Sequence, residues 1–110
     1  EWSLAELTSR GEGVYEKNCV ACHQASGQGM PPIFPALAGS EIALYDKSRH
    51  LEILMEGVQG AAMQSYANQL SEVDMAAVIT YTRQAWGNAE NGDGAYVVPK
   101  DIVEYKKPKI

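Results

Sequence analysis

The chain has 110 residues, of which 45% are hydrophobic, and a formal net charge of −5. This length and composition fit one globular domain rather than a disordered segment, and the acidic balance excludes an electrostatic footprint for nucleic acid. No run approaches about 18 consecutive apolar residues, so the sequence predicts no membrane span. The charge is uneven: residues 1–98 carry 5 Lys or Arg against 12 Asp or Glu, whereas residues 99–110 carry 4 Lys against 2 acidic residues.

The first predicted element is a helix from about residue 4 to about residue 18. Ser3 and Glu6 have the spacing of a capping box at its start, in which each side chain caps the other's backbone amide. Gly11 and Gly13 fall inside this helix, where each costs about 1 kcal/mol relative to Ala. That cost suggests that one of the two glycines packs closely against another backbone.

Both cysteines of the chain lie in the run Cys19-Val20-Ala21-Cys22-His23. A disulfide between positions three apart closes too small a loop to stabilise much, and a thioredoxin-like pair needs a βαβ setting that the surrounding sequence lacks. The pattern C-x-x-C-H is instead typical of covalent c-type haem attachment. Two thiols on one helical turn can reach the two vinyl groups of one porphyrin edge, and His23 then lies under the iron as its proximal ligand. Attachment of this kind takes place outside the bacterial cytoplasm or in the mitochondrial intermembrane space.

The middle of the chain alternates loops and helices. Residues 24–40 hold three glycines and three prolines, which predicts an irregular loop. Asp46 then caps a second helix, whose apolar residues recur at helical spacing and whose end is marked by glycines. A non-helical connection follows over residues 59–70. Ser71 caps a third long helix, which is expected to continue to about Trp86.

Beyond that helix, residues 88–95 are predicted to form a turn region. Part of the remaining tail is apolar and is expected to lie along the body. We therefore divide the chain into a domain over residues 1–95 and a C-terminal tail over residues 96–110. The predicted fold class is all-α, with three to four helices wrapped around one haem, long irregular loops and no β-sheet. In so short a chain, the haem supplies core that the polypeptide lacks.

His23 leaves the second axial position of the iron open, and electron transfer favours filling it with a protein ligand. The candidates are one histidine and four methionines: His50, Met30, Met55, Met63 and Met75. Two of the methionines, Met55 and Met75, fall on apolar helix positions that are typical of a core. Met30 follows His23 by only seven residues, a short distance in which to cross to the other face of the haem.

The remaining two candidates differ in their surroundings. His50 lies in the first turn of the second helix and is expected to face solvent. Met63 lies in a non-helical segment after two glycines and has room to turn its thioether inward, so it is the favoured ligand, with the others kept as alternatives. A His/Met pair raises the reduction potential relative to a His/His pair, because the soft thioether favours ferrous iron.

Over roughly residues 4–86 the chain resembles the class I cytochrome c family. Family members carry a Gly and an aromatic residue eight and four positions before the first haem cysteine, where this chain has Gly11 and Tyr15. The resemblance implies that these two residues cross the last helix at a close contact, with Tyr81 as the partner aromatic residue.

Two further family features concern the iron ligands. The run Pro35-Ala36-Leu37-Ala38-Gly39 matches a family pattern, which implies that the Pro35 carbonyl accepts the Nδ1 proton of His23 and fixes its ring. The ligand methionine of the family lies in the loop before the last helix, which here is Met63. Gln64 stands where the family often has proline, so the local shape of that loop is expected to differ.

A narrower resemblance is to the cytochrome c domain at the C-terminus of subunit II in caa-type haem–copper oxidases. The runs that carry it are residues 22–29, 34–39, 76–83 and 85–88, with Val-Pro-Lys near the C-terminus. The resemblance implies that this chain is an excised C-terminal piece of subunit II, because the membrane hairpin and the dinuclear-copper domain are not present. It also implies a place on the periplasmic side of the bacterial inner membrane, tethered to a membrane complex.

The favoured function is single-electron transfer by one haem c, with Cys19 and Cys22 holding the porphyrin and His23 and Met63 holding the iron. The domain alone would make and break no bond, so it is not expected to be an enzyme. Its expected partners are a donor redox protein, which reaches the exposed haem edge near residues 19–22 and 28–33, and the copper domain of the oxidase. The alternatives are a haem domain of a dehydrogenase chain and a peroxidase-like or gas-binding haem with an open distal site.

Overall fold

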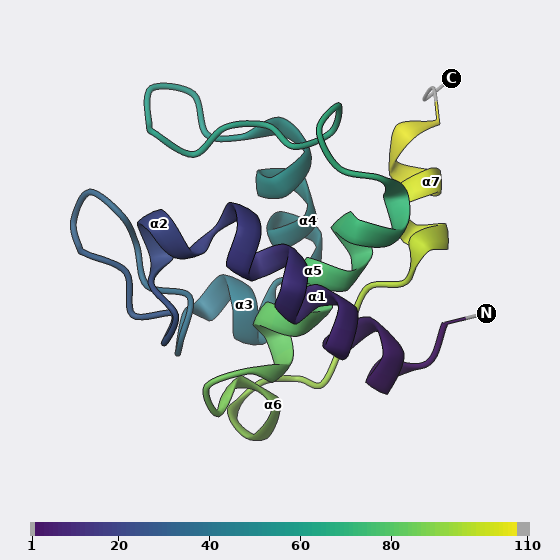
Figure 1. Ribbon diagram of the computed structural model, residues 1–110, viewed down its shortest axis with the longest axis horizontal. Coiled ribbons are helices and arrows are strands. Elements are labelled where there is room, and N and C mark those ends of the chain that lie inside the picture. Colours follow the sequence, from purple (N-terminus) through teal and green to yellow (C-terminus); the bar gives the residue numbers. More distant parts are fainter. Residues whose placement is uncertain (1, 108–110) are drawn as a thin grey trace.

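The computed structural model describes residues 2–107, and helices joined by long loops make up this part of the chain (Figure 1). The helices are α1 (Leu4–Asn18), α2 (Val20–His23), α3 (Glu41–Tyr45), α4 (Lys47–Glu56), α5 (Glu72–Gln84), α6 (Asn88–Asn91) and α7 (Pro99–Lys106). The described residues contain no strand, and their one β pairing is an isolated bridge between Met30 and Phe34. The all-α prediction is therefore confirmed. Within residues 2–107, every helix is too short or too polar to cross a bilayer.

The helices α1 and α5 cross at the centre of the fold (Figure 1). The predicted capping box starts α1: the Glu6 amide donates to Ser3 Oγ at 3.1 Å, and the Ser3 amide donates to Glu6 Oε1 at 2.8 Å. A Cβ at Gly11 would collide with the backbone carbonyl of Ala77 in α5, whereas a Cβ at Gly13 would meet nothing within 4 Å. Gly11 is thus the glycine that the close approach of the two helices requires.

Three aromatic rings lie beside this crossing. The Tyr15 and Tyr81 rings pack with centroids 5.5 Å apart, as the family resemblance implied, and Trp86 adds a third ring 5.2 Å from Tyr15. The predicted end of α5 was too late by two residues, because the helix ends at Gln84 and Trp86 has a φ of 57°. This backbone turn directs the indole to the loop after α2, where it donates to the Ala25 carbonyl at 2.9 Å.

Short helices account for most of the other differences from prediction. The loop over residues 24–40 is non-helical as predicted, but it leads into α3, and the predicted turn region contains α6. The cap at Asp46 is confirmed, since its side chain accepts from the Arg49 amide at 3.0 Å. The same helix, α4, ends at Glu56 and is capped by Gly57, whose φ is 74°. Elements of four or five residues carry too few positions to show a helical period.

The C-terminal segment packs against α5. Val97 and Ile102 are fully buried. The Thr80 hydroxyl donates to the Val97 carbonyl at 2.7 Å and accepts from the Val97 amide at 3.0 Å. Pro99, at the first helical position, starts α7, where its missing N–H costs nothing. The predicted tail thus includes a packed helix, and residues 108–110 lie outside the described part.

Candidate functional site

An apolar slot runs between α2 at one end and α3 and α4 at the other. It consists of two adjoining cavities, which we call the inner cavity, of about 170 Å³, and the outer cavity, of about 300 Å³. Five residues line both cavities: Cys19, His23, Pro35, Val58 and Met63. Most of the other lining side chains are apolar, which suits a large apolar cofactor and excludes water from its centre.

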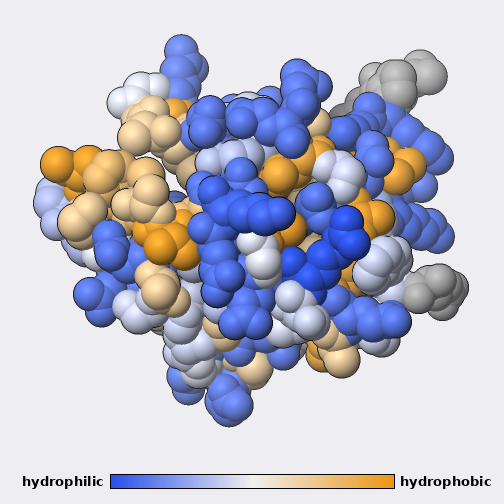
Figure 2. Space-filling model, in the orientation of Figure 1, coloured by the Kyte–Doolittle hydropathy of each residue, from blue (hydrophilic) through white to orange (hydrophobic). Residues whose placement is uncertain are grey.

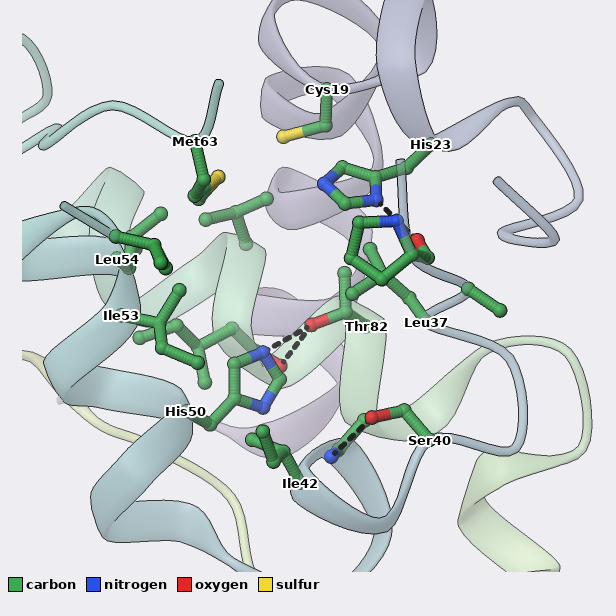
Figure 3. A pocket seen from close by; sticks show the side chains of 16 residues that line it. Cys19, His23, Leu37, Ser40, Ile42, His50, Ile53, Leu54, Met63 and Thr82 are labelled. Carbon is green, nitrogen blue, oxygen red and sulfur yellow. Dashed lines mark hydrogen bonds between the residues drawn. The ribbon is translucent and has the colours of Figure 1, made fainter. Parts of the chain in front are cut away.

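The end of α1 positions the C-x-x-C-H residues. Cys19 ends α1 and precedes α2, and its carbonyl accepts from the His23 amide at 2.9 Å, so the three motif side chains share one tight helical turn. His23 Nδ1 lies 2.9 Å from the Pro35 carbonyl oxygen, the contact that the resemblance implied. Because a carbonyl can only accept, Nδ1 carries the proton and Nε2 keeps a free lone pair. Figure 3 shows the His23 ring at the upper end of the cavity, on the same side as Cys19.

The Cys19 thiol does not have the properties of a redox nucleophile. Burial raises the pKa of the Cys19 thiol to about 11, with Cys22 adding to the shift. Catalytic cysteines need the opposite shift, because the thiolate is the nucleophile. The setting of Cys19 therefore disfavours disulfide exchange and leaves haem attachment as the chemistry that the motif fits.

Met63 reaches the slot from a loop that folds back on α4. The Val58 amide donates to the Met63 carbonyl at 3.0 Å, and the Tyr66 amide donates to the Leu54 carbonyl at 2.9 Å. A Cβ at Gly57 would lie 2.9 Å from the Met63 carbonyl oxygen, so glycine permits the fold-back. In Figure 3 the Met63 sulfur points into the cavity, toward the His23 side.

The other three methionines lie elsewhere. Met55 and Met75 are buried in the core, as their helix positions predicted, and Met30 is 48% exposed. None of the three lines either cavity, and all four methionines are within the described residues. Met63 is therefore the methionine that the fold brings to His23.

The expectation that His50 faces solvent was wrong. His50 lines the inner cavity together with Ile53 and Leu54, so it occupies the cavity side of α4 at positions i, i+3 and i+4. Figure 3 shows it at the opposite end of the cavity from Cys19 and His23. The helical spacing of these three residues was visible in the sequence. However, Leu51 and Met55 mark a second apolar face of the same helix, and this face was predicted to be the buried one.

Hydrogen bonds hold His50 in one neutral form. Its Nδ1 lies 3.3 Å from Arg83 Nη1, and its Nε2 lies 3.1 Å from Thr82 Oγ1. A guanidinium can only donate, so Nδ1 accepts and Nε2 carries the proton. Burial, and then the charge of Arg83, lower the pKa of His50 to about 3. Both ring nitrogens are thus engaged, and His50 has none free for iron.

Arg83 is a residue that sequence reasoning missed. Its side chain is only 1% exposed. Its guanidinium donates to the carbonyls of Ala95 at 2.7 Å and Ile42 at 3.0 Å, and it pairs with Asp93 at 3.1 Å. One arginine thus joins α5, α3 and the segment before α7 behind the cavity. The available signal was a charged residue in the otherwise uncharged second half of the last long helix.

Comparisons with known proteins agree with this site. The family model described as "Cytochrome C oxidase, cbb3-type, subunit III" matches residues 6–81. Cytochrome c-552 of Thermus thermophilus is 35% identical over 105 residues, covering 83% of this chain and 70% of that protein. The cytochrome c subunit of a quinone alcohol dehydrogenase from Gluconobacter oxydans is 33% identical, but the chain spans only 22% of its length.

Among solved structures, a cytochrome cL from Methylophaga aminisulfidivorans has the same fold, with a TM-score of 0.64. The match covers 96% of this chain and 69% of that chain, at 22% identity.

Proposed function

Since the chain belongs to the cytochrome c family and is an electron carrier with one haem c, we propose that it transfers electrons through an iron held by His23 and Met63. The observation that carries the proposal is that Met63, alone of the four methionines, lines the slot with His23 (Figure 3). When bound, the haem supplies an iron that alternates between the ferrous and ferric states.

The residues of this chain hold and tune that group. Cys19 and Cys22 bond the porphyrin edge. The Pro35 carbonyl fixes the His23 ring, and this hydrogen bond raises the basicity of the ligand nitrogen. The Met63 thioether would favour ferrous iron and so raise the reduction potential relative to that of a His/His pair.

Haem also carries two carboxylates at the edge away from its vinyl groups. The polar side chains of Ser40, His50 and Thr82 line the end of the cavity that lies away from Cys19. We assign the carboxylates to this end, because buried charged groups need polar partners and Ser40, which accepts from the Ala43 amide, keeps its hydroxyl proton to donate. The apolar side chains between the two ends exclude water, which keeps the iron site dry in both oxidation states.

A ferric absorption spectrum of the haem-loaded protein tests the ligand pair. A His/Met iron shows a near-infrared sulfur–iron charge-transfer band, and we expect that band at neutral pH. A folded protein that lacks the band would contradict the assignment and would favour a peroxidase-like or gas-binding haem with an open distal site.

We further propose that the electron acceptor is the copper centre of a terminal oxidase. The runs shared with subunit II of caa-type oxidases support this, and the matching family model is itself described as an oxidase subunit. On this proposal the chain lies on the periplasmic side of the bacterial inner membrane and is tethered to a membrane complex. Tethering gives a high effective concentration at the acceptor, so an acidic carrier needs little electrostatic steering.

A dehydrogenase chain is the second candidate, because one relative is a cytochrome c subunit of a quinone alcohol dehydrogenase. The two candidates differ in the direction in which the electron moves. An oxidase partner would take an electron from the haem protein, whereas a dehydrogenase partner would give one to it. Stopped-flow mixing of the reduced haem protein with an isolated dinuclear-copper domain should give rapid oxidation if the acceptor is an oxidase. Slow oxidation there, with rapid reduction by a quinone-dependent dehydrogenase, would favour the second candidate.

A further inference from the structure

The loop over residues 57–71, which carries Met63, joins α4 to α5, and α7 contacts the residues that flank the loop on both sides. At the first end, Tyr105 Oη donates to a carboxylate oxygen of Glu56, the last residue of α4, at 2.7 Å. That hydrogen bond raises the pKa of Tyr105 to about 12, with burial as the second cause. The phenol therefore keeps its proton and remains a donor at neutral pH.

The second end of the loop is held by the next residue of the same helix. Lys106 Nζ lies 3.4 Å from the Ala67 carbonyl oxygen and 3.3 Å from a carboxylate oxygen of Glu72, the first residue of α5. Each tie is partly exposed and weak by itself. Because Tyr105 and Lys106 are adjacent, however, the last turn of α7 spans both ends of the loop at once.

The helix that makes these ties is fixed independently of the loop. Ile102 of α7 is fully buried against the core, and Asp101 pairs with Lys47 of α4 at 3.3 Å. Figure 1 shows α7 beside α5, with its C-terminal end directed toward the segment where the loop rejoins α5. A restraint from α7 is therefore anchored on the rigid part of the molecule.

Other contacts hold the loop against α4 but do not join its two ends through a third element. The Val58 amide bonds the Met63 carbonyl, and the Ser65 hydroxyl donates to the Met55 carbonyl. We expect Met63 to leave the slot only when this loop moves relative to α4 and α5. The ties from Tyr105 and Lys106 oppose that movement.

We propose that α7 is a clamp across the ends of the loop 57–71 that keeps Met63 in the slot. This rests on the proposed role of Met63 as an iron ligand. Tyr105 and Lys106 are then positioning residues, which act on the iron only through Met63. Tyr105 and Lys106 lie beyond residues 6–81, the part that the family model matches.

The test uses the haem-loaded chain with Tyr105→Phe and Lys106→Met combined, which removes both ties and keeps the size of the side chains. The matched control is Lys107→Met, whose ammonium pairs only with Glu104 of the same helix among the interactions found for it. Cyanide binding to the ferric protein reports how often Met63 leaves the iron. We expect cyanide to bind about 3- to 10-fold faster in the double variant than in the control, the range that two weak polar ties can supply. The thermal midpoint of the helical far-ultraviolet signal, measured for both variants, reports their global stability.

Equal cyanide rates in the double variant and the control would overturn the clamp. The near-infrared band of the unchanged protein separates the two proposals. If the band is absent, Met63 is not the ligand and both proposals fail, whereas a normal band with unchanged cyanide rates removes the clamp alone.

Discussion

At the scale of single residues, Met63 carries the strongest expectation. Met63→Ala removes the one thioether that lines the slot with His23. The iron should lose its sulfur–iron band, show a lower reduction potential and bind cyanide readily, because a soft ligand that favoured ferrous iron has gone. Absorption spectroscopy and potentiometric titration of the haem-loaded variant measure all three effects.

Met30→Leu is the control for this change. Met30 is 48% exposed and lines neither cavity, so its replacement should leave the spectrum and the potential as they are. A Met63→Ala protein with an unchanged spectrum would refute the assignment of Met63 as the second ligand.

Arg83 illustrates a residue whose importance is structural. Arg83→Met leaves the carbonyls of Ile42 and Ala95 and the Asp93 carboxylate without their guanidinium partner. The expected loss in the free energy of unfolding is about 2–4 kcal/mol, near the lower part of the range for breaking a buried pair, because Asp93 is partly exposed. Denaturant titration of the haem-loaded protein measures it.

Arg49→Met provides the comparison, since Arg49 pairs with Glu52 on the surface and its side chain is 45% exposed. Its loss should change the free energy of unfolding by less than about 0.5 kcal/mol. Similar losses for the two arginines would mean that the buried network contributes nothing beyond an ordinary surface pair.

At the scale of elements, the sequence predicted the helices that have a cap and at least two turns of apolar period. The N-cap residues of α1, α4 and α5 are Ser3, Asp46 and Ser71, as expected. The short helices α3 and α6 carry no such period, and the course of α7 depends on Ile102 finding a partner on α5. Long-range packing of this kind is not encoded in any local pattern.

The site divides in the same way. The two cysteines and the histidine lie within five consecutive residues, Cys19 to His23, so their spacing alone pointed to the haem. The network of His50 with Thr82 and Arg83 joins residues more than 30 positions apart, and it exists only because α4 packs beside α5. Sequence reasoning therefore located the chemistry but misplaced the surroundings of His50.

The crossing of α1 and α5 makes a prediction with a built-in comparison. Gly11→Ala places a methyl group where the Ala77 carbonyl lies, and such overpacking should cost about 1–3 kcal/mol in the free energy of unfolding. Gly13→Ala, two residues away in the same helix, meets nothing within 4 Å. It should instead stabilise the protein by about 0.5–1 kcal/mol, the usual gain in a helix interior.

Denaturant unfolding of the two haem-loaded variants gives both values. If both substitutions stabilised the protein alike, the two helices could not approach as closely at Gly11 as the structure has them. A loss at both positions would instead show that α1 is constrained on a second side.

At the scale of the whole molecule, the haem slot opens beside an apolar part of the surface. Ile33 is 71% exposed and lines the outer cavity together with Cys22. Figure 2 shows apolar residues gathered at the left of the molecule, over the loop that follows α2, while much of the remaining visible face is polar. A haem held by Cys19 and Cys22 would have its thioether edge beside this face, so we expect electrons to pass to a partner here.

Ile33→Asn therefore tests where the partner docks. It removes an exposed apolar side chain at the mouth of the slot without changing the charge, and we expect about a 10-fold lower second-order rate constant for oxidation by a dinuclear-copper domain, the effect typical of one central interface residue. Oxidation by ferricyanide, which needs no docked protein, should be unaffected. Val103→Asn is the control, because Val103 is an exposed apolar residue on α7, 44% exposed and outside the slot. Equal rate constants for the two variants would mean that electrons leave through another face.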